Sequence, residues 1–214
     1  MKNLLILSIC LLLHLNLIAQ DKSVEADHLY TYQNLLKLSP VELGRAEFQI
    51  GFERYFNNRK TSLNTLISII SGDNGEEKRG GFQAFLQYRF YLSQLYKETH
   101  QTLNMYNIGF YSAPYILGLY QNETYSNWYY DPEKGDTQTE LVDEEITAGE
   151  GGVLLGVQFD ITKRIVLDIF MGGGVRQSKI VRNRDASGIE DYGLLDQGYS
   201  GVKPRIGLQM GITF

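Results

Sequence analysis

The chain has 214 residues, of which 43% are hydrophobic and 21% are charged, and its formal net charge is −5. Glycine and tyrosine are abundant at 22 and 15 residues while proline contributes four, which argues against a disordered, collagen-like or ordinary helical protein. The length fits one domain or at most two, and the acidic balance argues against a nucleic-acid partner. Beyond residue 18, no apolar run approaches the roughly 20 residues of a membrane-spanning helix.

The N-terminus has the pattern of an export signal. Lys2 precedes an apolar run from Leu4 to Ile18, and the small residue Ala19 ends that run. The lone cysteine, Cys10, lies inside this signal, so the exported chain has no disulfide, thiol nucleophile or cysteine metal ligand. The sequence therefore predicts a signal peptide, a short N-terminal segment and one β-barrel domain, at 1–19, 20–28 and 29–214.

From residue 29 onward, apolar and polar residues alternate with a period of two, which predicts strands. The clearest example is 205–214, in which one face is wholly apolar and the other is small or polar. The stretches 61–71 and 104–121 are rich in β-branched and aromatic residues but have faces that are harder to assign, and 29–38 is a shorter candidate strand. The eight expected strands lie at 29–38, 45–53, 61–71, 82–92, 104–121, 153–161, 164–176 and 205–214.

The connections between these strands tend to alternate between short and long. Such alternation is typical of a barrel with turns at one rim and surface loops at the other. The segment 94–103 is an exception, because it is too long for a tight turn. Counting back from a periplasmic C-terminus predicts four extracellular connections, at 39–43, 72–79, 122–147 and 182–201. The remaining connections, at 57–60, 94–103 and 162–163, then face the periplasm.

Charged residues of both signs occupy the polar faces of the five clearest strands, interleaved with glycine and glutamine. In a narrow closed barrel, small residues let opposite walls approach while paired charges fill the lumen. The apolar faces also have the ~9 to 11 residues of a tilted spanning strand. We therefore predict a transmembrane barrel with a lumen charge network formed by Arg45, Glu47, Glu53, Arg89, Asp160, Asp168, Arg176 and Arg205. The alternative is a soluble periplasmic, lipocalin-like binding barrel.

Aromatic residues cluster near the expected strand ends, which favours two interfacial girdles. They are Tyr30, Tyr32, Tyr55, Tyr91, Tyr106, Tyr120, Tyr125, Trp128, Tyr129, Tyr130 and Tyr199. Phe214 closes the last alternating strand. It looks like the C-terminal signal by which outer-membrane barrels are recognised by the barrel-assembly machinery.

Three stretches carry a resemblance to a known family: GFYSAPYILGLY (Gly109 to Tyr120), GVQFDITKRIVLDIFMGGGV (Gly156 to Val175) and PRIGLQMGITF (Pro204 to Phe214). The chain from about residue 29 resembles the small OmpA-like and OmpX-like eight-stranded outer-membrane barrels. It is most similar to an uncharacterised barrel family common in Bacteroidota. The resemblance implies a fold and an outer-membrane location, with no catalytic residues to transfer.

The sequence contains little that would support catalysis. An outer-membrane lipid A modifying enzyme, the second alternative, needs a nucleophile and a base in contact. Histidines outside the signal occur only at His28 and His100, and neither lies at the predicted outer rim. The acidic segment 122–147 could offer oxygen ligands to a divalent cation, but its spacing matches no known calcium loop. We expect a monomer without a cofactor, whose partners are outer-membrane lipids and lipopolysaccharide.

Overall fold

The computed structural model describes residues 33–57, 59–75, 77–92, 108–131, 135–162, 164–183, 192–194 and 196–214. These residues belong to one compact unit, Tyr32–Phe214. The predicted signal peptide and the segment after it lie outside the described residues, as do His28 and His100. Within the described part of the chain, no helix is both long and apolar enough to cross a membrane.

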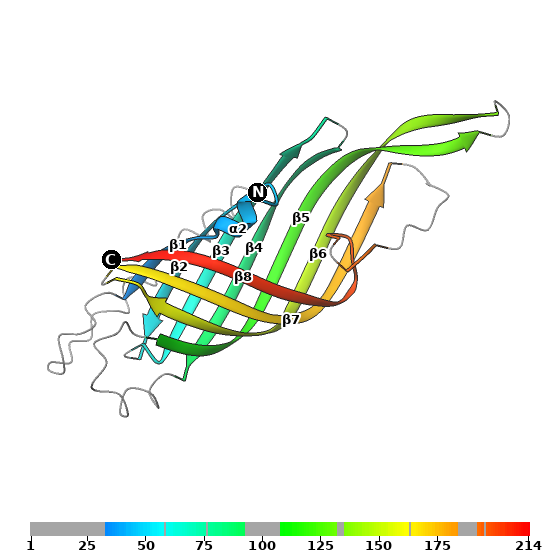
Figure 1. The fold of residues 1–214 in the computed structure, drawn as a ribbon. Helices are drawn as coiled ribbons and strands as arrows, with labels where there is room; N and C mark the ends of the chain where they lie inside the picture. Colours follow the sequence, from blue (N-terminus) through cyan, green and yellow to red (C-terminus); the bar gives the residue numbers. More distant parts are fainter. Residues whose placement is uncertain are drawn as a thin grey trace, which may run out of the picture. The chain divides into compact units, whose positions relative to one another are not determined.

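Eight antiparallel strands form a closed barrel, in which each strand pairs with the next and β1 pairs with β8 (Figure 1). The predicted eight-stranded, up-and-down, all-β architecture is confirmed. The elements are β1 (Asn34–Leu38), α2 (Pro40–Leu43), β2 (Glu47–Phe56), β3 (Thr61–Asp73), β4 (Glu77–Tyr91), β5 (Ile108–Asp131), β6 (Asp136–Asp160), β7 (Ile165–Arg182) and β8 (Gly201–Thr213).

Alternation in the sequence becomes alternation between the interior and the outer wall. In β4, Gln83, Gln87 and Arg89 are buried, whereas Phe82 and Phe90 on the other face are exposed. Because successive side chains of a strand point to opposite faces, the polar set lines the interior and the apolar set covers the outside. The barrel is therefore inside-out relative to a soluble protein.

Two of the predicted extracellular loops are largely strand. The expected loop 72–79 is reduced to a short turn, since β3 runs to Asp73 and β4 begins at Glu77. The expected loop 122–147 is mostly the far half of the hairpin of β5 and β6, which extends past the neighbouring strands (Figure 1). On the outward face of the hairpin, polar residues such as Thr124, Asp143 and Glu145 interrupt the apolar alternation from which strands were inferred, although β5 and β6 remain paired along its length.

The seam between the first and last strands is short. β1 has five residues, and it pairs with β8 only from Met210 to Thr213. Among the described residues, no strand pairs with that edge of β8 from Gly201 to Gln209. The helix α2 lies beside this part of the seam, in contact with both β2 and β8.

The backbones of β6 and β7 approach each other closely where Gly152 lies opposite Gly174. A Cβ atom added at Gly152 would lie 2.2 Å from the carbonyl oxygen of Gly173 and 2.4 Å from the Cα of Gly174. Both contacts are with backbone, which cannot turn away as a side chain can. Glycine is therefore required at position 152, because the two strands approach each other too closely for a side chain.

We expect Gly152→Val to prevent normal closure of the barrel. The free energy of unfolding should fall by at least the roughly 3 kcal/mol at the upper end of overpacking effects. Gly149→Val is the matched control, because a Cβ at Gly149 on the same strand meets no atom within 4 Å. Gel mobility of unboiled samples and denaturant titration would measure both variants, and equal behaviour would contradict the close approach of the two strands.

Candidate functional site in the barrel interior

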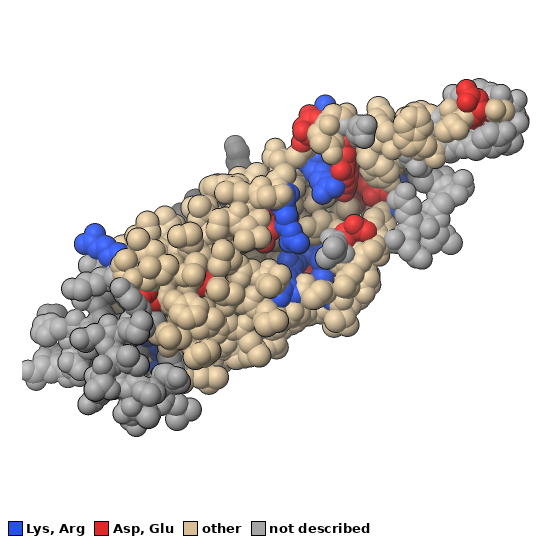
Figure 2. All heavy atoms as spheres, in the orientation of Figure 1, with Lys and Arg blue, Asp and Glu red and all other residues tan. Residues whose placement is uncertain are grey.

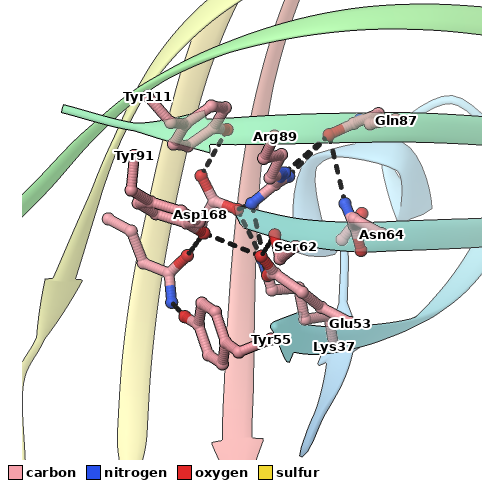
Figure 3. A network of polar contacts seen from close by, with 12 residues as sticks. Lys37, Glu53, Tyr55, Ser62, Asn64, Gln87, Arg89, Tyr91, Tyr111 and Asp168 are labelled. Atoms are coloured by element: carbon pink, nitrogen blue, oxygen red, sulfur yellow. Dashed lines mark hydrogen bonds and ion pairs between the residues drawn. The ribbon is translucent and has the colours of Figure 1, made fainter. Parts of the chain in front are cut away.

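Four fully buried charges from four strands meet in one half of the interior (Figure 3). The ammonium of Lys37 lies 2.6 Å from Asp168 Oδ2 and also contacts the carboxylate of Glu53. Nη1 of Arg89 lies 2.5 Å from Asp168 Oδ2 and 3.3 Å from Glu53 Oε2. The two cations balance the two carboxylates, so this ionic quartet places no net charge inside the barrel.

Neutral side chains complete the hydrogen bonding of the quartet. The hydroxyl of Tyr111 donates to Asp168 Oδ1 at 2.8 Å, and its ring lies 4.3 Å from the guanidinium carbon of Arg89. Gln87 Oε1 accepts from Arg89 Nε at 3.0 Å and from Nη2 at 2.6 Å. Ser62 donates to Glu53, and the Tyr91 hydroxyl lies 2.7 Å from Glu53 Oε1. Such partners are needed because buried ions lose their hydration.

An apolar layer follows the quartet along the strands. Phe85 lies between Arg89 and Gln83 on the interior face of β4, and Phe170 lies between Asp168 and Arg176 on that of β7. The two rings meet at an edge, with centroids 6.5 Å apart. Glycine at position 207 makes room for this layer, because a Cβ there would lie 2.2 Å from Phe170. The layer separates two charged clusters within the lumen.

The second cluster is centred on Glu150. Arg176 Nε donates to Glu150 Oε2 at 2.8 Å, and Arg205 donates to both carboxylate oxygens at 2.7 Å. The Tyr115 hydroxyl donates to Oε1, also at 2.7 Å. Arg176 Nη1 further binds the backbone and side-chain oxygens of Gln197, which belongs to the connection between β7 and β8. This cluster therefore ties the barrel wall to that connection.

Further ionic contacts surround the mouth at the same end of the barrel. Glu144 accepts from Arg182 and, at 2.8 Å, from the hydroxyls of Tyr125 and Tyr192. These contacts anchor the described part of the β7–β8 connection to the base of the long hairpin. Figure 2 shows acidic and basic side chains gathered in this area.

A second mouth cluster joins β4 to β5 beyond the apolar part of the outer wall. Arg79 Nε lies 2.8 Å from Glu77 Oε1 and 3.1 Å from Glu123 Oε1. Burial raises the pKa of the Glu123 carboxyl to about 7, and the neighbouring Glu77 adds to the rise. The two carboxyls thus share Arg79 and hold a proton near neutral pH.

The structure distributes the eight predicted lumen residues over several places. Glu53, Arg89 and Asp168 join the ionic quartet, and Arg176 and Arg205 join the Glu150 cluster. The other three positions differ. Glu47 is buried near the mouth, 3.4 Å from Gln197 Nε2, and Asp160 lies at the opposite rim, 3.7 Å from Arg59. The placement of Arg45 is wrong, as its side chain is 59% exposed and lies 3.7 Å from Glu42.

Arg45 lies outside the lumen because β2 begins only at Glu47. The preceding residue, Ala46, has a φ of 60°, which breaks the alternation that was extended back to Arg45. Some members of the expected aromatic girdles are also misplaced. Tyr55 and Tyr91 point into the interior, where Gln158 contacts both hydroxyls. Tyr30, Tyr32 and Tyr106 lie outside the described residues.

Sequence reasoning missed four buried charged residues: Lys37 and Glu150 in the two lumen clusters, and Glu144 and Lys203 nearer the mouth. Lys37 lies in the shorter candidate strand 29–38, for which the sequence assigns no faces. Glu150 precedes the expected start of its strand at 153, but it shares the even-numbered face of Leu154 and Gln158. Following that face back along the strand would have identified Glu150 as an interior residue. Tyr55 lies two residues after Glu53 on the same face, so the same reasoning would have placed Tyr55 inside.

Phe214 lies at the seam rather than free of the barrel. Its backbone exchanges two hydrogen bonds with Asn34, at 3.0 and 3.4 Å. Its ring is exposed and lies 6.4 Å from that of Phe52, centroid to centroid. The residue thus continues β8 along β1 and presents an aromatic surface on the outer wall.

Comparisons with known proteins leave the family of the chain open. No protein-family model matches the sequence, and no curated protein matches it significantly. Among solved structures, the N-terminal β-barrel domain of Pseudomonas aeruginosa OprF aligns over 86% of this chain and 98% of that chain. Its sequence identity is 11% and its TM-score is 0.37, values too low to assign a family or a function.

We expect Asp168→Asn to lower the free energy of unfolding by roughly 3 to 5 kcal/mol, because it leaves Lys37 and Arg89 buried against one carboxylate. Adding Lys37→Met should recover part of this loss by restoring the charge balance. Asp143→Asn, on the exposed outer face of β6, is the control and should cost less than about 1 kcal/mol. Denaturant unfolding measures all three. A loss below about 1 kcal/mol for Asp168→Asn would show that the interior is hydrated.

Proposed function

We propose that this chain is a small transmembrane barrel of the bacterial outer membrane, exported by the signal peptide 1–19 and inserted as a monomer. Its role is structural or one of surface interaction, through the long segments at one rim. The observation that carries this proposal is the apolar outer wall around a charged, filled interior. A soluble barrel would have the opposite polarity.

The outer wall exposes large apolar side chains that contact with water would not favour. Ile206 is 74% exposed and Met171 64%. Along Phe82–Leu92, Phe110–Tyr120, Ile165–Val175 and Val202–Phe214, no outward-facing residue is charged. We call this surface the apolar belt. Contiguous exposed apolar surface of this kind marks contact with a membrane or a partner.

The height of the belt matches a bilayer. The segments in β4, β5 and β7 each span 11 residues, within the ~9 to 11 residues of a tilted spanning strand. Beyond the belt the outer face turns polar, with Glu145 on β6 and Gln177 and Lys179 on β7. We infer that the rim carrying the long hairpin of β5 and β6 faces the cell exterior, and that the opposite rim, where β2 meets β3 and β6 meets β7, faces the periplasm.

The filled lumen favours a structural or binding role over a diffusion pore. The ionic quartet, the Phe85–Phe170 layer and the Glu150 cluster occupy successive levels of the interior. An eight-stranded barrel has an interior about wide enough for such side chains alone. The partners we propose are outer-membrane lipids and lipopolysaccharide, with the assembly machinery recognising Phe214.

We expect Ile206→Lys to cost roughly 2 to 4 kcal/mol of barrel stability in lipid vesicles, the penalty for a lysine at the bilayer midplane. Val181→Lys is the matched control. Like Ile206 on β8, Val181 on the neighbouring strand β7 is exposed on the outer face, but it lies beyond the belt. Urea unfolding in vesicles measures both changes. If the two lysines cost the same, the wall faces water and the soluble barrel replaces the membrane protein.

A further inference from the structure

The short first strand leaves an opening in the barrel wall. Because β1 ends at Leu38, the edge of β8 from Gly201 to Gln209 faces the start of β2 with no strand between them among the described residues. Strands lie about 4.8 Å apart, so one missing strand separates its flanking strands by roughly 10 Å. The helix α2 borders this opening, which we call the lateral gap.

One cavity of about 1330 Å³ reaches both sides of the wall. Its lining includes Gln197 and Arg205 from the interior, Glu47 from the edge of the gap, and Met171 and Ile206 from the apolar belt. Inward-facing and outward-facing residues share this cavity, which is consistent with a connection through the gap. Figure 2 shows basic side chains reaching the surface between α2 and the start of β8.

Buried cationic donors with unused hydrogen-bonding capacity lie at the inner end of the cavity and behind it. Lys203 is buried, and its ammonium donates only to the backbone oxygen of Asp196, at 2.6 Å, with no carboxylate in ion-pair contact within the described chain. Behind the cavity lining, Nη2 of Arg176 is buried and has no hydrogen-bond partner among the described residues. Unsatisfied buried donors are costly, and a buried cationic group without an acceptor is more so.

Two arginines, Arg176 and Arg205, lie close to Lys203, although the cavity lining as a whole holds six carboxylates and four cationic side chains. The carboxylates of Glu150 and Asp196 are near it as well. Glu150 is already shared between the two arginines. Glu47 lies on the β2 side of the gap, so it would direct an incoming carboxylate toward β8. The unused donors therefore suit an oxyanion that enters beside an apolar surface.

We propose that the lateral gap binds a single-chain fatty acid from the membrane. Its carboxylate accepts hydrogen bonds from Lys203 Nζ, and its hydrocarbon chain lies against Met171 and Ile206, all three of which line the cavity. A gap one strand wide admits one extended chain, which selects against a lipid with two chains. This inference rests on the proposed function, because the belt must face lipid for the chain to enter from the side.

The test is photo-crosslinking of a diazirine-bearing palmitic acid to the full-length chain in lipid vesicles. Labelling should saturate and should map to the belt residues of β7 and β8. Lys203→Met should weaken apparent binding at least tenfold. Lys179→Met, which removes the same charge from the outer face above the belt, should leave it unchanged. Unlabelled palmitate should compete, whereas 1-hexadecanol and dipalmitoyl phosphatidic acid should not.

Met171→Trp provides a second variant that leaves the interior intact, and it should reduce labelling by filling the outer part of the cavity. Labelling that does not saturate, that persists equally in Lys203→Met, or that hexadecanol displaces as well as palmitate does, would overturn the proposal. Carbonate extraction of the same vesicles separates the two claims. Protein that is retained but unlabelled contradicts only the fatty-acid site, whereas protein that is released contradicts the membrane location.

Discussion

The ionic quartet imposes the constraint on which the rest of the barrel depends. Lys37, Glu53, Arg89 and Asp168 are fully buried, and each carboxylate touches both cations. Charges in such a place are tolerated only when their partners stay in position, because an unpaired buried ion costs several kcal/mol. The quartet draws on β1, β2, β4 and β7, so it requires the register of strands across the whole ring.

The same constraint links the interior to the outer wall. A slip of one residue in β7 would turn Asp168 outward and bring Leu167 or Ile169 into the lumen, since a strand has a period of two. The error would place a carboxylate in the belt and leave Lys37 and Arg89 short of one partner. The strand register that places the charges in the lumen is therefore the same register that places the apolar residues in the belt. Beyond the belt, neither a charged lumen nor an apolar wall is needed, and β5 and β6 continue there as a polar hairpin.

Prediction from the sequence succeeded where a strand has one apolar face. The alternation in 205–214 located β8, and that in 82–92 placed Arg89 inside. It failed where local backbone geometry or the pairing of polar strands determines the structure. The polar hairpin is held by backbone hydrogen bonds, which leave no hydrophobic pattern, and the turn at Ala46 displaces Arg45. Lys37 could not be predicted, because a five-residue strand carries too little alternation to assign its faces.

The most direct test of an apolar belt around an ionic interior is tryptophan quenching by brominated lipids. The chain has one tryptophan, Trp128, which is 70% exposed on the hairpin beyond the belt. In vesicles of brominated phospholipid, native fluorescence should stay unquenched. A variant with Trp128→Phe and Leu155→Trp should be strongly quenched, because Leu155 lies on the outer wall. Quenching of Trp128 alone, or of neither tryptophan, would contradict the account.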